Sequence, residues 1–109
     1  MEKYPRIALR TVDRLLFVHP EEILYAIADG NYTQIYLTND RSVRVVRKLK
    51  GVSELLTAEH FIRIHRSHLI NLEHIQSYDD DEVVVMNDGK RLAVARHRKA
   101  KLIEKFTKI

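Results

Sequence analysis

Turn motifs recur along most of this sequence and separate short apolar runs, which restricts the chain to a fold built largely from short strands. The clearest turns are Asp29-Gly30-Asn31 and Asn87-Asp88-Gly89, because Gly and Asn accept the positive φ angles of tight hairpins. Between turns, apolar and polar residues alternate, as they do from Thr33 to Leu37. The predicted strands cover residues 7–12, 15–18, 23–28, 33–37, 43–45, 61–64, 75–78, 83–86 and 91–94.

Two segments change to a helical period. In residues 48–56 the helix contains Gly51, which lowers helix propensity by about 1 kcal/mol, so tertiary packing must hold this segment. From Arg96 the helical pattern continues to the end of the chain. Its apolar arc holds Leu102, Ile103, Phe106 and Ile109, and its basic arc holds Arg98, Lys101, Lys105 and Lys108. The predicted fold class is therefore mostly β (α+β), with two short helices.

The length and composition exclude several classes of protein. A chain of 109 residues suits one domain with a single core, so we expect one domain over residues 1–109. The absence of cysteine excludes disulfides, thiolate catalysis and Cys-based zinc sites. No apolar run approaches the roughly 20 residues that cross a bilayer, and the N-terminal sequence lacks a secretory signal. These features favour a cytoplasmic protein without membrane contact.

Positive charge is concentrated in two blocks. The net charge is +4, but residues 41–78 carry a balance of +4 and residues 96–109 a balance of +5, whereas residues 1–40 and 79–95 are net negative. Such segregation suggests a positive face for an anionic partner. A surface that serves only solubility would give similar totals. The acidic run Asp79–Glu82 would repel phosphate, so we expect it to lie away from such a partner as a solvated hairpin loop.

The stretch from Phe61 to Ile75 combines apolar and donor-rich residues. It begins as a strand, breaks its alternation at His65-Arg66-Ser67-His68 and resumes with Leu69-Ile70. Four consecutive hydrogen-bond donors suit phosphate oxygens and the acceptor edge of guanine. The alternative is a strand end with solvated polar residues. Asn71 is expected to bond to the backbone in a local turn or cap.

The sequence resembles the LytTR DNA-binding domain, a family found in many bacterial regulators of the LytR/AgrA type. The resemblance covers about residues 5–107, and its most specific part is FIRIHRSHLINLEHI, residues 61–75. That segment meets the family pattern F-x-R-x-H-(R/N)-S-x-L-(V/I)-N-x-x-x-I at every position. Three further segments match, namely ILYAIADGNYTQIYL, RVVRKLKGVSELL and RLAVARHRKAKL.

The resemblance implies an elongated sandwich of three small antiparallel sheets with short peripheral helices, including a C-terminal helix. It implies sequence-specific binding of double-stranded DNA by loops that enter two successive major grooves and bend the DNA. We expect a monomer in solution, two copies of which occupy direct repeats in promoters, without a cofactor. Family members often follow a receiver or a membrane sensor in response regulators of two-component systems. The chain has no receiver pattern, so either it is the output domain of a longer regulator or it stands alone.

Three loop regions carry the DNA contacts that the resemblance implies, namely residues 31–33, 65–67 and 96–99. Arg66 and Arg96 are the leading base readers, because a guanidinium donates two bonds to guanine O6 and N7. Asn31 could pair with adenine or serve its own turn, and His65 could donate to DNA or bond to backbone. Arg66 and Tyr32 stand where some members carry Asn and His, which leaves the target sequence open. The further residues predicted to contact bases or phosphates are Tyr32, Thr33, Ser67, Arg44, Arg47, Lys48, Lys50, His97, Arg98 and Lys99.

Two other functions compete with this prediction. His65 and His68 are possible metal ligands. However, a spacing of three along one strand puts side chains on opposite faces, and no HExxH motif is present. We therefore expect no enzyme activity and no bound metal. The second alternative is an RNA or single-strand binding module, which would need aromatic residues spaced along a sheet face. Tyrosines are present here, but no such aromatic run occurs.

Overall fold

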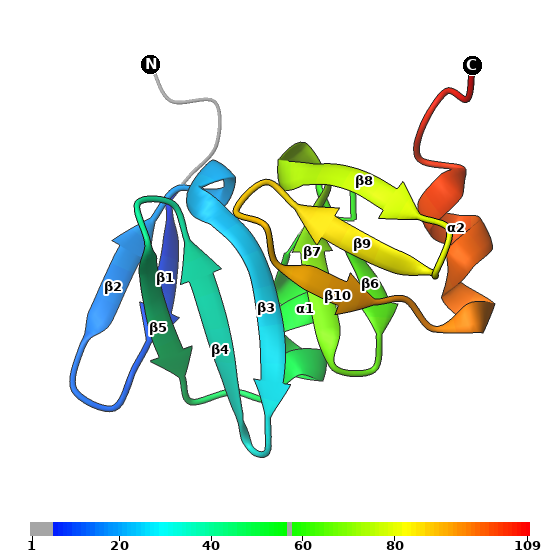
Figure 1. The fold of residues 1–109 in the computed structure, drawn as a ribbon. Helices are drawn as coiled ribbons and strands as arrows, with labels where there is room; N and C mark the ends of the chain where they lie inside the picture. Colours follow the sequence, from blue (N-terminus) through cyan, green and yellow to red (C-terminus); the bar gives the residue numbers. More distant parts are fainter. Residues whose placement is uncertain (1–5, 57) are drawn as a thin grey trace.

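Three antiparallel sheets account for the strands predicted from the sequence (Figure 1). The computed structural model describes residues 6–56 and 58–109. A hairpin of β1 and β2 forms the smallest sheet, β8, β9 and β10 form the second, and the other five strands form the third. The strands are β1 (Ile7–Arg10), β2 (Leu15–Val18), β3 (Ile23–Asp29), β4 (Tyr32–Leu37), β5 (Arg41–Val45), β6 (Phe61–His65), β7 (His68–Asn71), β8 (Ile75–Asp79), β9 (Val83–Met86) and β10 (Arg91–Ala93).

The five-stranded sheet has the order β5-β4-β3-β7-β6. The meander predicted for residues 23–46 is confirmed as β3, β4 and β5. The sequence did not predict that β7 pairs with β3, where Ala26 lies opposite Leu69. This pairing joins two hairpins that are about forty residues apart and brings their turns to the same end of the sheet.

Short helices flank the sheets, and α1 and the η3–α2 segment begin where the two helices were predicted. They are η1 (Pro20–Glu22), α1 (Leu49–Leu55), η2 (Leu72–His74), η3 (Arg96–Arg98) and α2 (Lys99–Ile103). The prediction of a helix to the end of the chain was wrong, since α2 ends at Ile103. Leu102 is buried, but Phe106 and Ile109 are exposed, so no packing holds a further turn. No helix in the described residues has the length and apolar character that crossing a membrane requires.

Two apolar clusters lie on opposite faces of the five-stranded sheet. Neighbouring residues of β7 show the division, because Leu69 belongs to the cluster with α1 and the β1–β2 hairpin. Ile70 belongs to the cluster with β8, β9, β10 and α2. The result is a layered, sandwich-like arrangement in which the central sheet is covered on both faces.

Two buried polar side chains of the five-stranded sheet form hydrogen bonds inside the fold. Tyr25 stacks on Tyr36 and its hydroxyl donates to Asp88 of the β9–β10 turn over 2.8 Å. Burial first, and then the Asp88 carboxylate, raise the pKa of Tyr25, so the hydroxyl keeps its proton. Asn71, which is 1% exposed, accepts from the Glu73 amide. The predicted backbone-bonding role of Asn71 is therefore confirmed.

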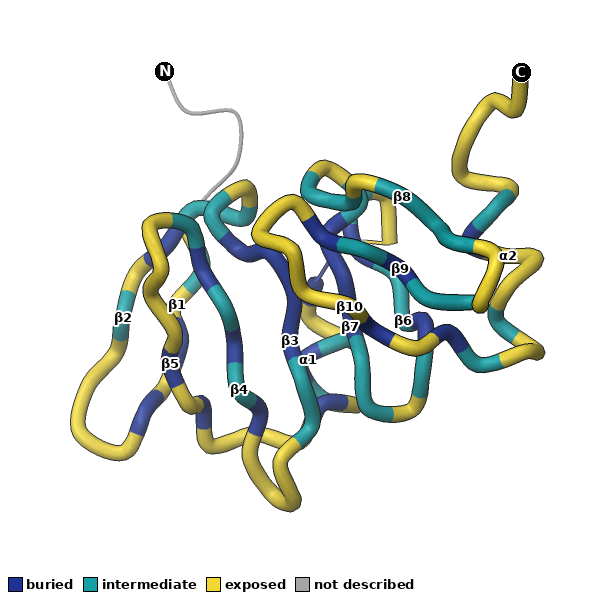
Figure 2. Tube along the Cα trace, in the orientation of Figure 1, coloured by how far each residue is buried: buried dark blue, intermediate teal, exposed yellow. Residues whose placement is uncertain are grey.

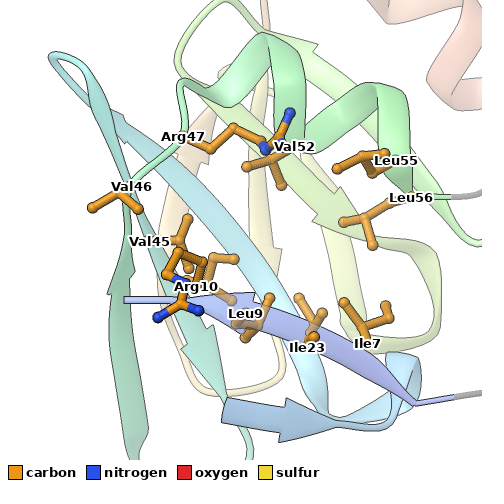
Figure 3. Close-up of a pocket in the computed structure, with 12 residues that line it drawn as sticks. Ile7, Leu9, Arg10, Ile23, Val45, Val46, Arg47, Val52, Leu55 and Leu56 are labelled. Atoms are coloured by element: carbon orange, nitrogen blue, oxygen red, sulfur yellow. The ribbon is translucent and has the colours of Figure 1, made fainter. Parts of the chain in front are cut away.

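An apolar cavity of about 180 Å³ separates β1 from α1 (Figure 3). Leu9 and Ile23 line its side nearer the sheets, and Val52 and Leu56 line the side of α1. Most of its lining is apolar, with Arg10 and Arg47 at its margin, so this space belongs to the packing between the β1–β2 hairpin and the rest of the domain.

Candidate nucleic-acid interface

Four connecting segments lie along one edge of the molecule, which we call the loop edge (Figure 1). It consists of the β3–β4 turn, the β5–α1 linker, the β6–β7 turn and the η3 segment, residues 30–32, 46–48, 65–68 and 95–99. Both turns point to the lower side in Figure 1, and the chain after β10 passes the β6–β7 hairpin on its way to α2. Figure 2 shows that the tips of these turns are exposed.

Main-chain hydrogen bonds connect three of these segments. The amide of Ala28, at the end of β3, donates to the carbonyl of Ser67 in the β6–β7 turn over 2.9 Å. The amide of Ala95, just before η3, donates to the carbonyl of Ile64 over 2.8 Å. The three loop regions predicted from the resemblance are thus held side by side, and the β6–β7 hairpin lies between the other two.

Two histidine rings face each other across the β6–β7 hairpin. His65 pairs with His68 in the strand register, and their ring centroids are 4.7 Å apart. The prediction that these side chains point to opposite faces was wrong, because Arg66 and Ser67 form a tight turn and the residues sit on two facing strands. His68 Nδ1 donates to the carbonyl of Ala93 over 3.0 Å, which ties the hairpin to β10.

His65 serves the turn as a hydrogen-bond acceptor. Its Nδ1 accepts from the Ser67 amide over 3.1 Å, which requires that this nitrogen carry no proton. Burial lowers the pKa of His65, and nearby basic groups lower the pKa further. These groups are His68, Arg66, Arg98 and Arg63. The ring is therefore neutral at pH 7, and its proton is on Nε2, which can donate to a partner.

The folded protein is expected to lose stability as the pH falls below about 6.5, the ordinary pKa of histidine. Above that pH the ring is neutral in both states, and below it the unfolded chain takes up the proton first, which favours unfolding. Urea melts from pH 7.5 to pH 5 measure this loss. The variant His65→Asn provides the control, because its amide oxygen replaces the Nδ1 acceptor without titrating. A loss of stability that is equal in both proteins would contradict the assignment to His65.

Arg66 and Arg96 are two of the exposed cations of the loop edge. Both side chains are exposed, Arg66 at the tip of the β6–β7 turn and Arg96 at the first position of η3. Among the described residues neither guanidinium takes part in an ion pair or a side-chain hydrogen bond. All five donors of each side chain are therefore available to a partner.

The Tyr32 ring at the β3–β4 turn packs against an arginine side chain. Arg44 forms an ion pair with Asp29 over 2.9 Å, and its guanidinium lies 4.6 Å from the centroid of the Tyr32 ring. The Asp29 carboxylate offsets part of the charge that Arg44 was predicted to offer to phosphate. Asn31 is exposed at the tip, next to Gly30, whose positive φ of 61° makes the tight turn.

Thr33 does not reach the surface. Its side chain is fully buried, and its hydroxyl donates to the Arg47 carbonyl over 2.7 Å. The predicted contact between Thr33 and DNA therefore does not fit the structure, because the strand alternation turns this residue toward the core. Its bond instead fixes the β5–α1 linker against the start of β4.

The remaining residues that were predicted to contact DNA lie at the two ends of the loop edge. Arg47 and Lys48 are exposed in the β5–α1 linker, and Lys50 is exposed on the first turn of α1. The Arg47 side chain lies against Gly51, where an added Cβ would come within 2.9 Å of it. On the other side, η3 and α2 present His97, Arg98 and Lys99. The Lys99 ammonium lies 5.7 Å from the centroid of the Tyr78 ring.

Arg63 is the basic residue that the sequence analysis missed. It lies on β6, donates to the carbonyl of Arg66 and receives a bond from Arg98 at its own carbonyl over 3.5 Å. Burial and the charge of Arg98 lower its pKa. An arginine that interrupts the apolar pattern of a strand, and that occupies the arginine position of the F-x-R motif, was the signal that could have identified it.

Two observations bear on the alternative functions. Among the described residues no group of three His, Cys, Asp or Glu side chains is placed to hold a metal ion. Tyr25 is buried, and its ring stacks on Tyr36 with centroids 4.7 Å apart. Tyr25 therefore offers no open ring face of the kind on which single-stranded bases stack.

The acidic run forms the β8–β9 turn. Arg91 forms ion pairs with Asp79 over 3.2 Å and with Asp81 over 2.7 Å, so part of the negative charge is neutralised. The carbonyl of Glu82 accepts from the Val94 amide, which places the end of the run next to the chain that leads into η3. The expectation that these carboxylates avoid DNA stays a prediction.

Comparison with known proteins identifies relatives over nearly the whole chain. The profile of the LytTr DNA-binding domain, which is a non-enzymatic domain, matches residues 13–107. The sensory transduction protein LytT of Bacillus subtilis is 28% identical over 95 residues, which are 84% of this chain and 39% of that protein. The heme-containing CO-sensing transcriptional regulator RcoM 1 of Paraburkholderia xenovorans is 27% identical over 104 residues, 91% of this chain and 39% of that protein. The chain thus spans about two fifths of the length of these relatives.

A solved structure has the same fold. The LytTr DNA-binding domain of a putative methyl-accepting/DNA response regulator from Bacillus cereus superposes with a TM-score of 0.77. The match covers 94% of this chain and 96% of that one at 23% sequence identity, so it supports the fold alone. The mostly β fold of small antiparallel sheets with a C-terminal helix agrees with the sequence-based expectation. Together with the profile match, these observations show that the chain belongs to the LytTR DNA-binding domain family.

Proposed function

We propose that this chain recognises specific double-stranded DNA sequences through its loop edge and regulates transcription. The observation that carries the proposal is the pair of exposed arginines, Arg66 and Arg96, which have no side-chain partner among residues 6–56 and 58–109 and project from segments held together by main-chain bonds. Guanidinium groups on a rigid frame suit bidentate contact with guanine in a major groove. We propose that the loop edge as a whole spans successive grooves, with the DNA bent toward the protein.

The names of the relatives support a role in signal transduction. The chain covers about two fifths of proteins called sensory transduction protein and transcriptional regulator. We propose that it acts as the DNA-binding output of such a regulator, either joined to a receiver or sensor domain or alone. In this role one domain spans the chain, works in the cytoplasm, and binds promoter repeats as two copies.

Selection from a random duplex pool at near-physiological salt tests the proposal. The expected result is an enriched motif, with repeats of it bound more tightly than a single site. Single strands of the selected sequence serve as the competitor. If the single strand binds as tightly as the duplex, the chain is a single-strand binder, and if no motif is enriched, the loop edge does not read bases.

A further inference from the structure

A cationic cleft lies behind the loop edge, where the end of α1, β6 and α2 meet. It has a volume of about 440 Å³. Four basic side chains line it, and Glu104 is the one acidic side chain that lines it among the described residues. The basic residues are Arg63, Arg98, Lys101 and Lys105, and the apolar floor includes Leu56, Phe61 and Leu69.

The two arginines of this cleft lack a counter-ion. Arg98 donates to the carbonyl of Arg63, which holds the two cationic residues together. The Nε atoms of both residues are buried without a hydrogen-bond partner. Within the described residues neither side chain forms an ion pair. Two neighbouring cations with unpaired N–H donors would be stabilised by an anion that accepts hydrogen bonds from both.

We propose that this cleft binds a phosphate group, with Arg63 and Arg98 at its inner end and Lys101 and Lys105 at its rim. Two guanidinium planes and two ammonium groups match a tetrahedral anion with several acceptor oxygens. If the phosphate belongs to DNA, it lies on a strand that flanks the bases read by the loop edge. In that case the inference extends the proposed DNA-binding function and rests on it. A free phosphate group offers the same chemistry, so the test separates the two sources.

The position of Arg63 supports a link to the loop edge. Its guanidinium donates to the carbonyl of Arg66, so the cleft and the tip of the β6–β7 turn share one side chain. A phosphate held at Arg63 would therefore fix the strand that supports Arg66. Of the two rim lysines, Lys101 lies on α2 and Lys105 follows its end, and both side chains are exposed.

The test combines a double variant, Lys101→Gln with Lys105→Gln, and a matched control, Lys90→Gln with Lys108→Gln. All four lysines are exposed, and neither control residue lines the cleft, so the overall charge changes equally without touching it. The DNA arm measures the dependence of binding on salt. Each lost phosphate contact lowers the log–log slope by about 0.9. The phosphate arm titrates inorganic phosphate and follows the Arg63 and Arg98 Nε–H resonances by NMR.

A slope reduced by about one in the double variant alone, with an unchanged base preference, supports a DNA phosphate in the cleft. Shifts of both Nε–H resonances at millimolar phosphate, weakened in the double variant and without an effect on the slope, support a free phosphate ligand. If neither arm distinguishes the double variant from its control, the proposal is overturned. The phosphate arm needs no DNA, so failure of the DNA-binding function is read separately from failure of the cleft.

Discussion

Replacing Arg66 by alanine is expected to weaken binding to the selected duplex by about 5- to 150-fold and to relax the preference at one base position. This range corresponds to the roughly 1–3 kcal/mol of discrimination that a bidentate arginine–guanine pair provides. The exposed Arg66 side chain has no internal partner in the described structure, so its removal should leave stability almost unchanged. Fluorescence anisotropy with the selected site and with single-base substitutions of it measures both effects.

Arg96→Ala is expected to have an effect of the same size at a different base position. The two arginines project from separate loops, so their free energies of binding should add approximately in the double variant. Arg41→Ala is the matched control, because Arg41 pairs with Glu22 at the other end of β5. If Arg66→Ala and Arg96→Ala weaken all sequences equally, these residues contact phosphates and the bases are read elsewhere.

Replacing Asn71 by alanine is expected to destabilise the fold by about 3 kcal/mol and to lower the melting temperature by about 10–20 °C. The side chain donates to the carbonyl of Ile23 over 2.9 Å and reaches that of Pro20 at 3.5 Å. It also accepts from the Glu73 amide as the cap of η2. Removing it leaves buried polar groups without partners at the point where β3, β7 and η2 meet. Calorimetry or thermal melting monitored by circular dichroism measures the change.

Asn87→Ala is the appropriate control for Asn71→Ala. Asn87 lies in the exposed β9–β10 turn, and its main-chain amide donates to the carbonyl of His74 over 2.8 Å, a bond that alanine keeps. This variant should stay within about 0.5 kcal/mol of the parent protein. A loss for Asn71→Ala no larger than that would show that water or a shift of the backbone satisfies the freed groups.

The local structure was largely predictable, because it depends on short-range signals. Asp29-Gly30-Asn31 and Asn87-Asp88-Gly89 form turns, and the meander from β3 to β5 follows the alternation of the sequence. The pairing of β7 with β3 was not predicted, since it joins residues such as Ala26 and Leu69 that no local pattern relates. The C-terminal helix was overextended because a repeating apolar pattern does not show whether a surface is available to receive it.

The candidate site was predictable by residue type but not by geometry. Arg66 and Arg96 are exposed on the loop edge, as a contact with DNA requires. Thr33 was placed wrongly, because its neighbour Tyr32 and not Thr33 faces outward at the start of β4. The association of Arg63 with Arg98 depends on the contact between β6 and η3, segments more than thirty residues apart, and no sequence spacing indicates it.

The bonds from Ala28 to Ser67 and from Ala95 to Ile64 use main-chain atoms alone. They are therefore indifferent to the side chains at positions 31, 66 and 96, which lie beside them. Substitutions at these three positions therefore leave the two main-chain bonds in place. A library that varies these three residues should contain mostly folded proteins. If the loop edge reads bases, its members should differ in the DNA sequences that they bind.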